Sequence, residues 1–301
     1  MISIEHALGN ERRMRALTSM GTEAFQGLLA LWKTASQAQA AQQTVEGHGR
    51  QRAVGGGRKG VLAQAEAKLF FILFYLKAYP TQDVMGSLFG LSQPQVCEWV
   101  ARLLPMLEKF MTVHLPARHG RQLSEVLAAM PEVGEVLLDG TERPISRPEH
   151  KGRRDAHYSG RRKRTTVKNV VVTANHRVVL LTPTVPGRRH DKTEADKARI
   201  RLPAGMRLLA DSGLQGYRAG AATVCTPHKK PRERPLHWQH RRANRKLAQV
   251  RVAVEHVFSS VKRLGVLRQP LRMRRPNAAD KVMLIGCGLH NYRETQIQLS
   301  A

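Results

Sequence analysis

Three carboxylates in this 301-residue chain have the types and positions that could hold a divalent metal ion. Asp139 follows the mostly apolar residues 135–138, and Asp211 follows the mostly apolar residues 206–210. Each pattern predicts a β-strand that ends at the aspartate, before a turn that contains glycine. Glu255 lies in a segment with helical periodicity, and a helix packed across the strands would bring it to the aspartates. Oxygen ligands suit Mg²⁺ or Mn²⁺, so we expect a site for two ions that supports phosphodiester displacement.

Two basic residues lie near Glu255 on the expected helix. In the helix expected over residues 237–264, Arg251 and Lys262 lie close in angle to Glu255, beside the stripe that would be buried. One interpretation is a surface ion pair, because Arg251 and Glu255 are four residues apart. The other is that both cations stabilise a reacting phosphate, and the spacing alone does not decide between them.

The aspartates also have a simpler interpretation as turn residues at the ends of strands. Both aspartates together, with a helix carboxylate in a strongly basic chain, favour a nuclease over that alternative. Nucleotide hydrolysis has no support, because no Walker-type loop follows a predicted strand.

The charge balance indicates a polyanionic partner. Lys and Arg number 50 against 23 Asp and Glu, a net charge of +27, which makes nucleic acid the first candidate. A membrane partner is not expected, because there is no basic amphipathic helix, no lipidation signal and no apolar run of bilayer length. Aromatic residues make up only 5%, which argues against an RNA-binding protein that stacks bases on a sheet.

The cysteines favour a reducing compartment. Cys97, Cys225 and Cys287 are odd in number and far apart, which suits free thiols in a cytosol and excludes a CxxC metal site.

The sequence predicts three regions. Residues 1–60 indicate a short helical segment and a basic, glycine-rich linker at 48–60; residues 61–115 indicate a helix-turn-helix domain; residues 130–295 indicate a mixed α/β domain. In the last region we expect strands at 135–139, 165–174, 177–184 and 206–211, and helices at 192–200, 237–264 and 278–292. Asn175 and His176 would form the turn of a hairpin.

The helix-turn-helix prediction depends on residues 81–104. Gly90 would end the first helix and Ser92 would cap the second. We expect the second helix to bury Val96, Trp99, Val100 and Leu103 and to present Gln93, Gln95 and Glu98 outward. Glutamine can read adenine, so residues 92–104 are the expected recognition helix. An ordinary helical hairpin would give the same pattern.

Four motifs together resemble a known family. They are residues 138–144 (LDGTERP), 187–191 (GRRHD), 209–217 (LADSGLQGY) and 251–262 (RVAVEHVFSSVK). The resemblance is to DDE transposases of bacterial insertion sequences, in the branch related to Harbinger-type nucleases, and it runs from about Lys68 to Tyr292. Each motif is weak alone, and the set is specific.

The resemblance implies a ribonuclease-H-like fold with a metal-binding triad at Asp139, Asp211 and Glu255. Arg251 and Lys262 match the basic residues that flank the family's glutamate. Ala248 departs from the pattern, since many relatives have tyrosine there, so a role of that tyrosine is absent here.

Asp191 belongs to a motif of the family, and we interpret it as a helix cap or a support for a metal ligand, with direct metal binding as the alternative. Gln93 and Gln95, together with the basic run Arg161, Arg162, Lys163 and Arg164, are the expected DNA-binding residues.

A transposase of this kind would bind the inverted-repeat ends of its element, cut them and transfer the strands, as a homodimer or larger assembly on DNA in the bacterial cytoplasm, associated with the nucleoid. The alternative is a domesticated, catalytically silent DNA-binding protein that acts as a repressor. The intact triad argues against that alternative.

Overall fold

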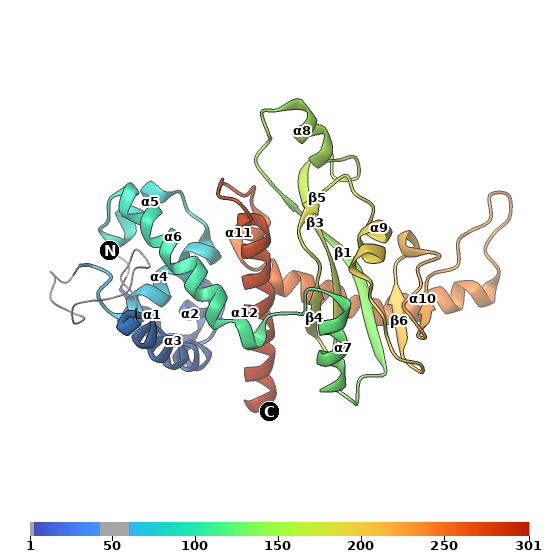
Figure 1. Ribbon diagram of the computed structural model, residues 1–301, viewed down its shortest axis with the longest axis horizontal. Helices are drawn as coiled ribbons and strands as arrows, with labels where there is room; N and C mark the ends of the chain where they lie inside the picture. The colour runs from blue at the N-terminus through green and yellow to red at the C-terminus, as the bar shows by residue number, and fades with distance from the viewer. Residues whose placement is uncertain (1–2, 43–59, 301) are drawn as a thin grey trace. The chain divides into compact units, whose positions relative to one another are not determined.

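The computed structural model describes residues 3–42 and 60–300, and they divide into two compact units (Figure 1). The first comprises the described residues up to Val113 together with Arg263–Val266, and the second comprises His114–Lys262 and the described residues from Leu267 onward. The predicted basic linker lies outside the described residues, apart from Gly60. None of the described helices has the length and apolar character that a membrane span requires.

The first unit is helical throughout its described residues. Its helices are α1 (Ile4–Leu8), α2 (Glu11–Thr18), α3 (Thr22–Gln42), α4 (Ala65–Ala78), α5 (Gln82–Phe89) and α6 (Gln93–Phe110). Residues 69–76 of α4 are all buried. The reason is that α2, α3 and α6 all pack against this helix, as expected for a helix that is apolar on every side.

Helices α5 and α6 form the predicted helix-turn-helix. Gly90 ends α5 with φ of 68°, a left-handed conformation that glycine adopts without strain. Phe89, the last residue of α5, lies with its ring centroid 5.0–6.3 Å from those of Phe70, Phe71 and Phe74 on α4. This aromatic cluster fixes α5 to the core of the unit, and the tight turn then sets the direction of α6.

The start of α6 differs from the prediction in one respect. The Ser92 hydroxyl accepts from the Gln95 backbone N–H, and the Gln95 side-chain oxygen accepts from the Ser92 backbone N–H at 2.9 Å, which is a capping box. Gln93 donates from its side-chain amide to Gln82. The glutamines are exposed as predicted, but each already has a local partner.

The sequence predicted that Trp99 belongs to the buried face of α6, and this prediction is wrong. It is only half-buried, and the Lys68 ammonium and the Arg102 guanidinium lie 5.6 and 5.9 Å from its ring centroid. Val96, Val100 and Leu103 do form the buried face. The indole packs beneath two cations, a favourable arrangement for an aromatic face.

The second unit contains a mixed sheet with the order β2-β3-β1-β6-β7. In addition, β4 pairs with residues 171–174 of β3, and β5 pairs with residues 167–168 of β3. The strands are β1 (Glu135–Pro144), β2 (Tyr158–Ser159), β3 (Arg164–Ala174), β4 (Arg177–Leu181), β5 (Val185–Pro186), β6 (Arg207–Ala210) and β7 (Thr223–Cys225). Strands β1, β3 and β4 form an antiparallel meander, whereas β6 and β7 run parallel to β1. Asn175 and His176 make the predicted turn with φ of 45° and 61°.

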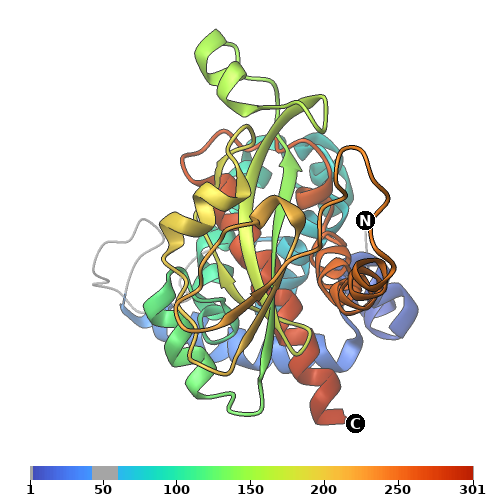
Figure 2. The same cartoon turned by 90° about the vertical axis from the view of Figure 1, so that its right-hand side faces the viewer.

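Helices cover both faces of this sheet (Figure 2). On one face α7 (Gly120–Ala128) and α9 (Asp191–Ala198) cover a core to which Leu138, Val170 and Leu208 contribute. On the other face lie α10 (Trp238–Val261) and α12 (Ala278–Ser300). The remaining helices are α8 (Lys151–His157) and α11 (Gly265–Arg268), with 3₁₀ turns at Thr112–His114 and Ser212–Leu214. This mixed α/β architecture is ribonuclease-H-like.

Two buried polar residues attach α12 to the sheet. The Asn291 side chain bonds to both the N–H and the C=O of Val178, each at 2.8 Å, so it satisfies the backbone of β4 along its open edge. Arg143 donates to the Ala279 carbonyl at 2.8 Å and to Asn169 at 2.5 Å. Burial lowers the pKa of Arg143 to about 10, which leaves it charged at neutral pH.

The capping box generates a prediction. Replacing Gln95 by Ala removes the acceptor for the Ser92 N–H, so the free energy of unfolding should fall by about 0.5–1 kcal/mol in urea titrations. Gln95→Glu is the matched control, because glutamate serves equally in a capping box. Unchanged stability of Gln95→Ala, together with altered base preference, would show that Gln95 acts by contacting bases instead.

Candidate active site

The two predicted aspartates are neighbours at one edge of the parallel part of the sheet. Leu138 of β1 pairs with Ala210 of β6, so Asp139 and Asp211 are the next residues on the two strands. The prediction that the first strand ends at Asp139 is wrong, because β1 continues to Pro144 beside β3. Only the pairing with β6 ends there. Asp139 therefore lies where β1 loses its parallel neighbour, which opens space beside its carboxylate.

Arg251 of α10 reaches both aspartates. Its guanidinium lies 3.4 Å from the Asp139 carboxylate and 3.7 Å from that of Asp211. The side chains of Arg251 and Asp139 are only 19% and 17% exposed, whereas that of Asp211 is 45% exposed. Arg251 thus bridges two strand-end carboxylates, and the interpretation of Arg251 as a surface partner of Glu255 does not describe these contacts.

Each aspartate is also held by the backbone that follows it. Asp139 accepts a hydrogen bond from the Gly140 N–H at 2.7 Å. Asp211 accepts one from the Ser212 N–H at 2.5 Å and caps the 3₁₀ turn that begins there. Asp211 is therefore a turn residue, as the simpler interpretation predicted, and this does not prevent it from binding a metal ion. These bonds use the Oδ1 atom of each carboxylate and fix how each group points.

The electrostatics of Asp139 show that the three carboxylates act on one another. Burial raises the pKa of Asp139 to about 6, and the negative charges of Glu255 and Asp211 add to the rise. The Gly140 N–H and the positive charge of Arg251 oppose it. Burial thus disfavours the ionised form of Asp139 even with Arg251 beside it, and a further cation at this position would favour that form.

Glu255 lies one helical turn beyond Arg251 on the same helix and is exposed. Within the described ranges, no three His, Cys, Asp or Glu side chains lie close enough to hold a metal ion, so Glu255 does not join the aspartates as a preformed site. The donor set nevertheless fits a hard divalent ion. It consists of carboxylates on adjacent strands that a cation, the Arg251 guanidinium, already bridges.

Lys262 follows α10 directly as its C-cap and is mostly buried. Burial lowers the pKa of its ammonium, the cations Arg162 and Arg143 lower it further, and Glu255 acts in the opposite sense. The ammonium lies 5.8 Å from the centroid of the Phe258 ring. Lys262 therefore belongs to a cationic group that includes one residue of the predicted basic run.

That basic run forms the turn between β2 and β3. Arg161, Arg162 and Lys163 occupy the turn, Arg164 begins β3, and all four are exposed. Together with α8 this hairpin extends beyond the rest of the sheet (Figure 1). The electrostatic effect of Arg162 on Lys262 places the basic run on the side of the sheet where Lys262 lies.

Asp191 lies on the opposite face of β1 from Asp139. It is the first residue of α9, and His190 is the N-cap, so the prediction of a cap is not borne out. A Cβ on Gly140 would lie 2.5 Å from an Asp191 oxygen, so a larger residue there would force the Asp191 side chain to move. Because neighbouring residues of a strand face opposite sides, the Asp191 carboxylate is on the α9 side.

A buried ion-pair network explains why Asp191 is there. The Lys168 ammonium lies 3.2 Å from Asp191 and 3.5 Å from Glu142, and it donates to the Arg189 carbonyl at 2.9 Å. Glu142 also accepts from the Thr166 hydroxyl at 3.0 Å. This network joins residues of two family motifs and attaches α9 to the sheet, a structural role that the sequence did not reveal.

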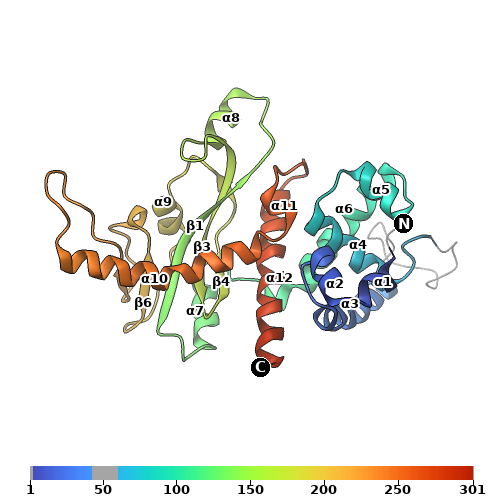
Figure 3. The ribbon, with the colours of Figure 1, turned by 180° about the vertical axis from the view of Figure 1, so that it is seen from behind.

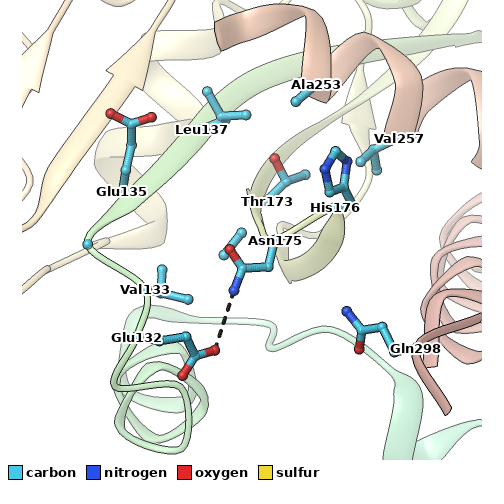
Figure 4. Close-up of a pocket in the computed structure, with 12 residues that line it drawn as sticks. Glu132, Val133, Glu135, Leu137, Thr173, Asn175, His176, Ala253, Val257 and Gln298 are labelled. Atoms are coloured by element: carbon cyan, nitrogen blue, oxygen red, sulfur yellow. Dashed lines mark hydrogen bonds between the residues drawn. The ribbon is translucent and has the colours of Figure 1, made fainter. Parts of the chain in front are cut away.

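The described pockets lie elsewhere. One of about 470 Å³ lies beside the start of β1 and is lined by Glu135, Leu137, His176 and Val257, among others (Figure 4). A second, of about 840 Å³, lies below α8 and has Arg147, Arg153 and Arg274 in its lining. Neither includes a residue of the triad.

Comparison with known proteins agrees with this geometry. Residues 138–291 match the family model described as "DDE superfamily endonuclease", and residues 61–111 match "Helix-turn-helix of DDE superfamily endonuclease". The chain is 27% identical over 228 residues to the "Probable transposase for insertion sequence element IS702" of Microchaete diplosiphon, which covers 75% of this chain and 80% of that protein. No solved structure matches the chain.

The raised pKa of Asp139 predicts a pH-dependent stability. The folded-state pKa is about 6 against an ordinary value of 3.8, so ionisation opposes folding, and stability should fall as the pH rises between these values. The shift corresponds to at most about 3 kcal/mol. In EDTA, Asp139→Asn should therefore be stabilised relative to the parent at pH 8 and not at pH 4, as measured by urea unfolding.

Asp155→Asn, at an exposed position on α8, controls for the general effect of removing a negative charge. An Asp139→Asn variant that is equally destabilised at both pH values would contradict the electrostatic description and would show that the bond to Arg251 matters more than the burial of charge.

Proposed function

Because the chain belongs to the DDE superfamily endonucleases and carries the helix-turn-helix of that family, we propose that it is a metal-dependent transposase that binds the inverted-repeat ends of its own element. In this proposal Asp139, Asp211 and Glu255 are the metal ligands for strand cleavage and strand transfer. The observation that carries the proposal is the bridging of Asp139 and Asp211 by the Arg251 guanidinium.

The aspartates are oriented for this role by the backbone. The Oδ1 atom of each is engaged by the N–H of the next residue. The Oδ2 atom of Asp139 accepts from Arg251 at 3.4 Å, so an ion bound there would displace the guanidinium, whereas the Oδ2 atom of Asp211 is open to an ion. Glu255, from α10, would supply the third carboxylate. Bound Mg²⁺ or Mn²⁺ ions, two in this proposal, would activate the attacking water or 3′-hydroxyl and stabilise the leaving oxygen.

Arg251 and Lys262 have roles that the ions do not supply. Arg251 screens the repulsion between the two aspartates before DNA arrives, and its charge is then available to a phosphate. Lys262 lies in a cationic group with Arg162 and Arg143, and burial strengthens its interaction with an anion. We propose that Lys262 stabilises the negative charge that develops on the phosphate as it is attacked.

End recognition would be the function of α6. The capping box fixes the first turn of this helix, so residues after Ser92 are presented in a defined direction. Gln93 donates its amide to Gln82 and Gln95 uses its oxygen in the cap. We propose that Gln93 offers its carbonyl oxygen and Gln95 its NH₂ group to base edges, one bond each in place of the bidentate contact expected from sequence.

The triad is tested by cleavage of DNA that carries the sequences flanking the gene. Asp139→Ala, Asp211→Ala and Glu255→Ala should each abolish Mg²⁺- or Mn²⁺-dependent nicking while DNA affinity in EDTA stays close to that of the parent. Asp196→Ala, on the α9 side of the sheet, is the control and should cut at the parental rate. Cleavage by Asp211→Ala would refute the ligand assignment.

A parent protein that binds these ends tightly and never cuts them, in either metal, would favour the alternative of a silent, repressor-like protein. Cleavage that persists in excess EDTA would refute the metal mechanism and leave the binding role intact.

The cations are tested by comparing rate with stability. Lys262→Ala should reduce single-turnover cleavage by a factor of about 100 or more, equivalent to about 3 kcal/mol of transition-state stabilisation. Arg251→Ala should lose a similar factor, and it should also be destabilised in EDTA and regain stability when Mg²⁺ is added, because the ion takes over the screening. Lys192→Ala, on the opposite face of the sheet, is the matched control. If both variants cut at the parental rate, Arg251 and Lys262 do not stabilise the reacting phosphate and have only a structural role.

A further inference from the structure

A strongly basic surface lies on α10 and the loop before it, outside the candidate active site. Residues 228–250, which we call the basic arm, contain one carboxylate, Glu233. Their eight Lys and Arg residues are all exposed, and they are Lys229, Lys230, Arg232, Arg234, Arg241, Arg242, Arg245 and Lys246. The arm extends past the edge of the sheet in the ribbon views (Figures 1 and 3).

The arm has a defined conformation. Asn244 of α10 accepts from the His228 N–H at 2.8 Å and donates to the His228 carbonyl at 3.0 Å. The imidazole rings of His228 and His240 stack with centroids 4.0 Å apart and an angle of 14° between their planes. His228 thus attaches the start of the loop to two residues of the helix, which reduces the ordering that binding a partner would require.

Among residues 3–42 and 60–300, the cations of the arm form no ion pair. In the part of the chain that the structure describes, the recorded ion pairs include none of the eight. A single carboxylate cannot balance eight positive charges, and their mutual repulsion opposes the folded arrangement. Such a concentration of charge is complementary to a polyanion, and in an endonuclease of DNA the polyanion is the DNA backbone.

The position of the arm on α10 links it to the candidate site. Arg241 and Arg245 lie one turn apart on one side of the helix, and Ala248, Val252 and Glu255 continue the same side toward the aspartates. Ala248 and Val252 are small and exposed, so they leave room for a backbone to pass close to the helix. From Arg245 to Glu255 the helix rises roughly 15 Å, a length of about four base pairs.

We propose that the basic arm binds the phosphate backbone of the duplex that flanks the bond to be cut, without reading its sequence. The line of α10 then directs that duplex toward Glu255. The assignment of a cut bond near Glu255 rests on the proposed function, whereas the binding of DNA by the arm does not.

The test is the salt dependence of binding to a duplex of random sequence, measured with the full-length chain in EDTA. Arg241→Ala/Arg245→Ala should lower the affinity by roughly 10- to 100-fold at 0.1 M salt and reduce the slope of log K against log salt by about 1–2, since up to two phosphate contacts are lost. The control is Arg201→Ala/Arg207→Ala, which removes two exposed charges elsewhere in the same unit and should leave the slope unchanged.

Two single variants separate charge from conformation. Asn244→Ala keeps every charge but releases the loop, so the affinity should fall severalfold at an unchanged salt slope. Ala248→Glu places a negative charge on the path between Arg245 and Glu255 and should weaken duplex binding without removing a cation. If a lesion of the arm changes neither affinity nor slope, or changes them no more than the control does, the proposal is overturned.

Competition identifies the polyanion. The double variant should lose duplex DNA binding, and a loss confined to single-stranded RNA would overturn the choice of DNA. Because the assay contains no metal and no element ends, failure of the triad variants to affect cleavage would refute the proposed function and leave the result for the arm standing. If the triad variants lose cleavage as expected but the double variant of the arm keeps the parental salt slope, the proposal for the arm is refuted and the proposed function stands.

Discussion

Asp139 and Asp211, carboxylates on neighbouring strands, repel each other, and the candidate site is arranged around that repulsion. Asp139 and Asp211 are brought together by the parallel register of β1 and β6, which the apolar packing of the sheet enforces. Arg251 is the compensating charge. Its position requires α10 to cross this face of the sheet, and the buried residues Val254, Val257, Phe258 and Val261 hold the helix there. Hydrophobic burial thus places charges where electrostatics alone would separate them.

The compensation is incomplete, and this gives the site its chemical character. The pKa of Asp139 stays raised to about 6 although a guanidinium lies beside it, because burial disfavours its charge and Glu255 and Asp211 add to that effect. Positive charge collects nearby at Lys262, Arg143 and Arg162, where burial and mutual repulsion lower the pKa of Lys262. In the proposed function, the metal ligands would therefore lie near the cations that stabilise the phosphate.

The sequence predicted the parts of the site that depend on local patterns. Asp139 and Asp211 could be placed at neighbouring strands because each follows an apolar run, and Arg251 could be placed near Glu255 by helical spacing. The continuation of β1 to Pro144 could not be predicted, because residues 140–144 lack apolar alternation and are held by pairing with β3. The contact of Arg251 with two aspartates, more than 30 residues away along the chain in each case, depends on the crossing of α10 over the sheet.

Other differences have equally local causes. The capping box of Ser92 and Gln95 was present in the sequence as a serine followed three residues later by glutamine, a signal of helix capping that was interpreted as base recognition. Trp99 was assigned to the core from its helical spacing, but the cations on either side of the indole come from two different helices. The sequence suggests that Asp191 supports a metal ligand, but its carboxylate lies close to Gly140 and pairs with Lys168, contacts that depend on how α9 packs on the sheet.

The central claim is that Asp139, Asp211 and Glu255 hold the catalytic metal, and crystals of the parent protein soaked in Mn²⁺ test it most directly through the anomalous scattering of the ion. The account predicts an anomalous peak in contact with the carboxylates of Asp139 and Asp211, with Glu255 turned toward it and the Arg251 guanidinium displaced from its bridging position. A saturating soak that leaves Arg251 between the two aspartates, or that places Mn²⁺ only on other residues, would contradict it.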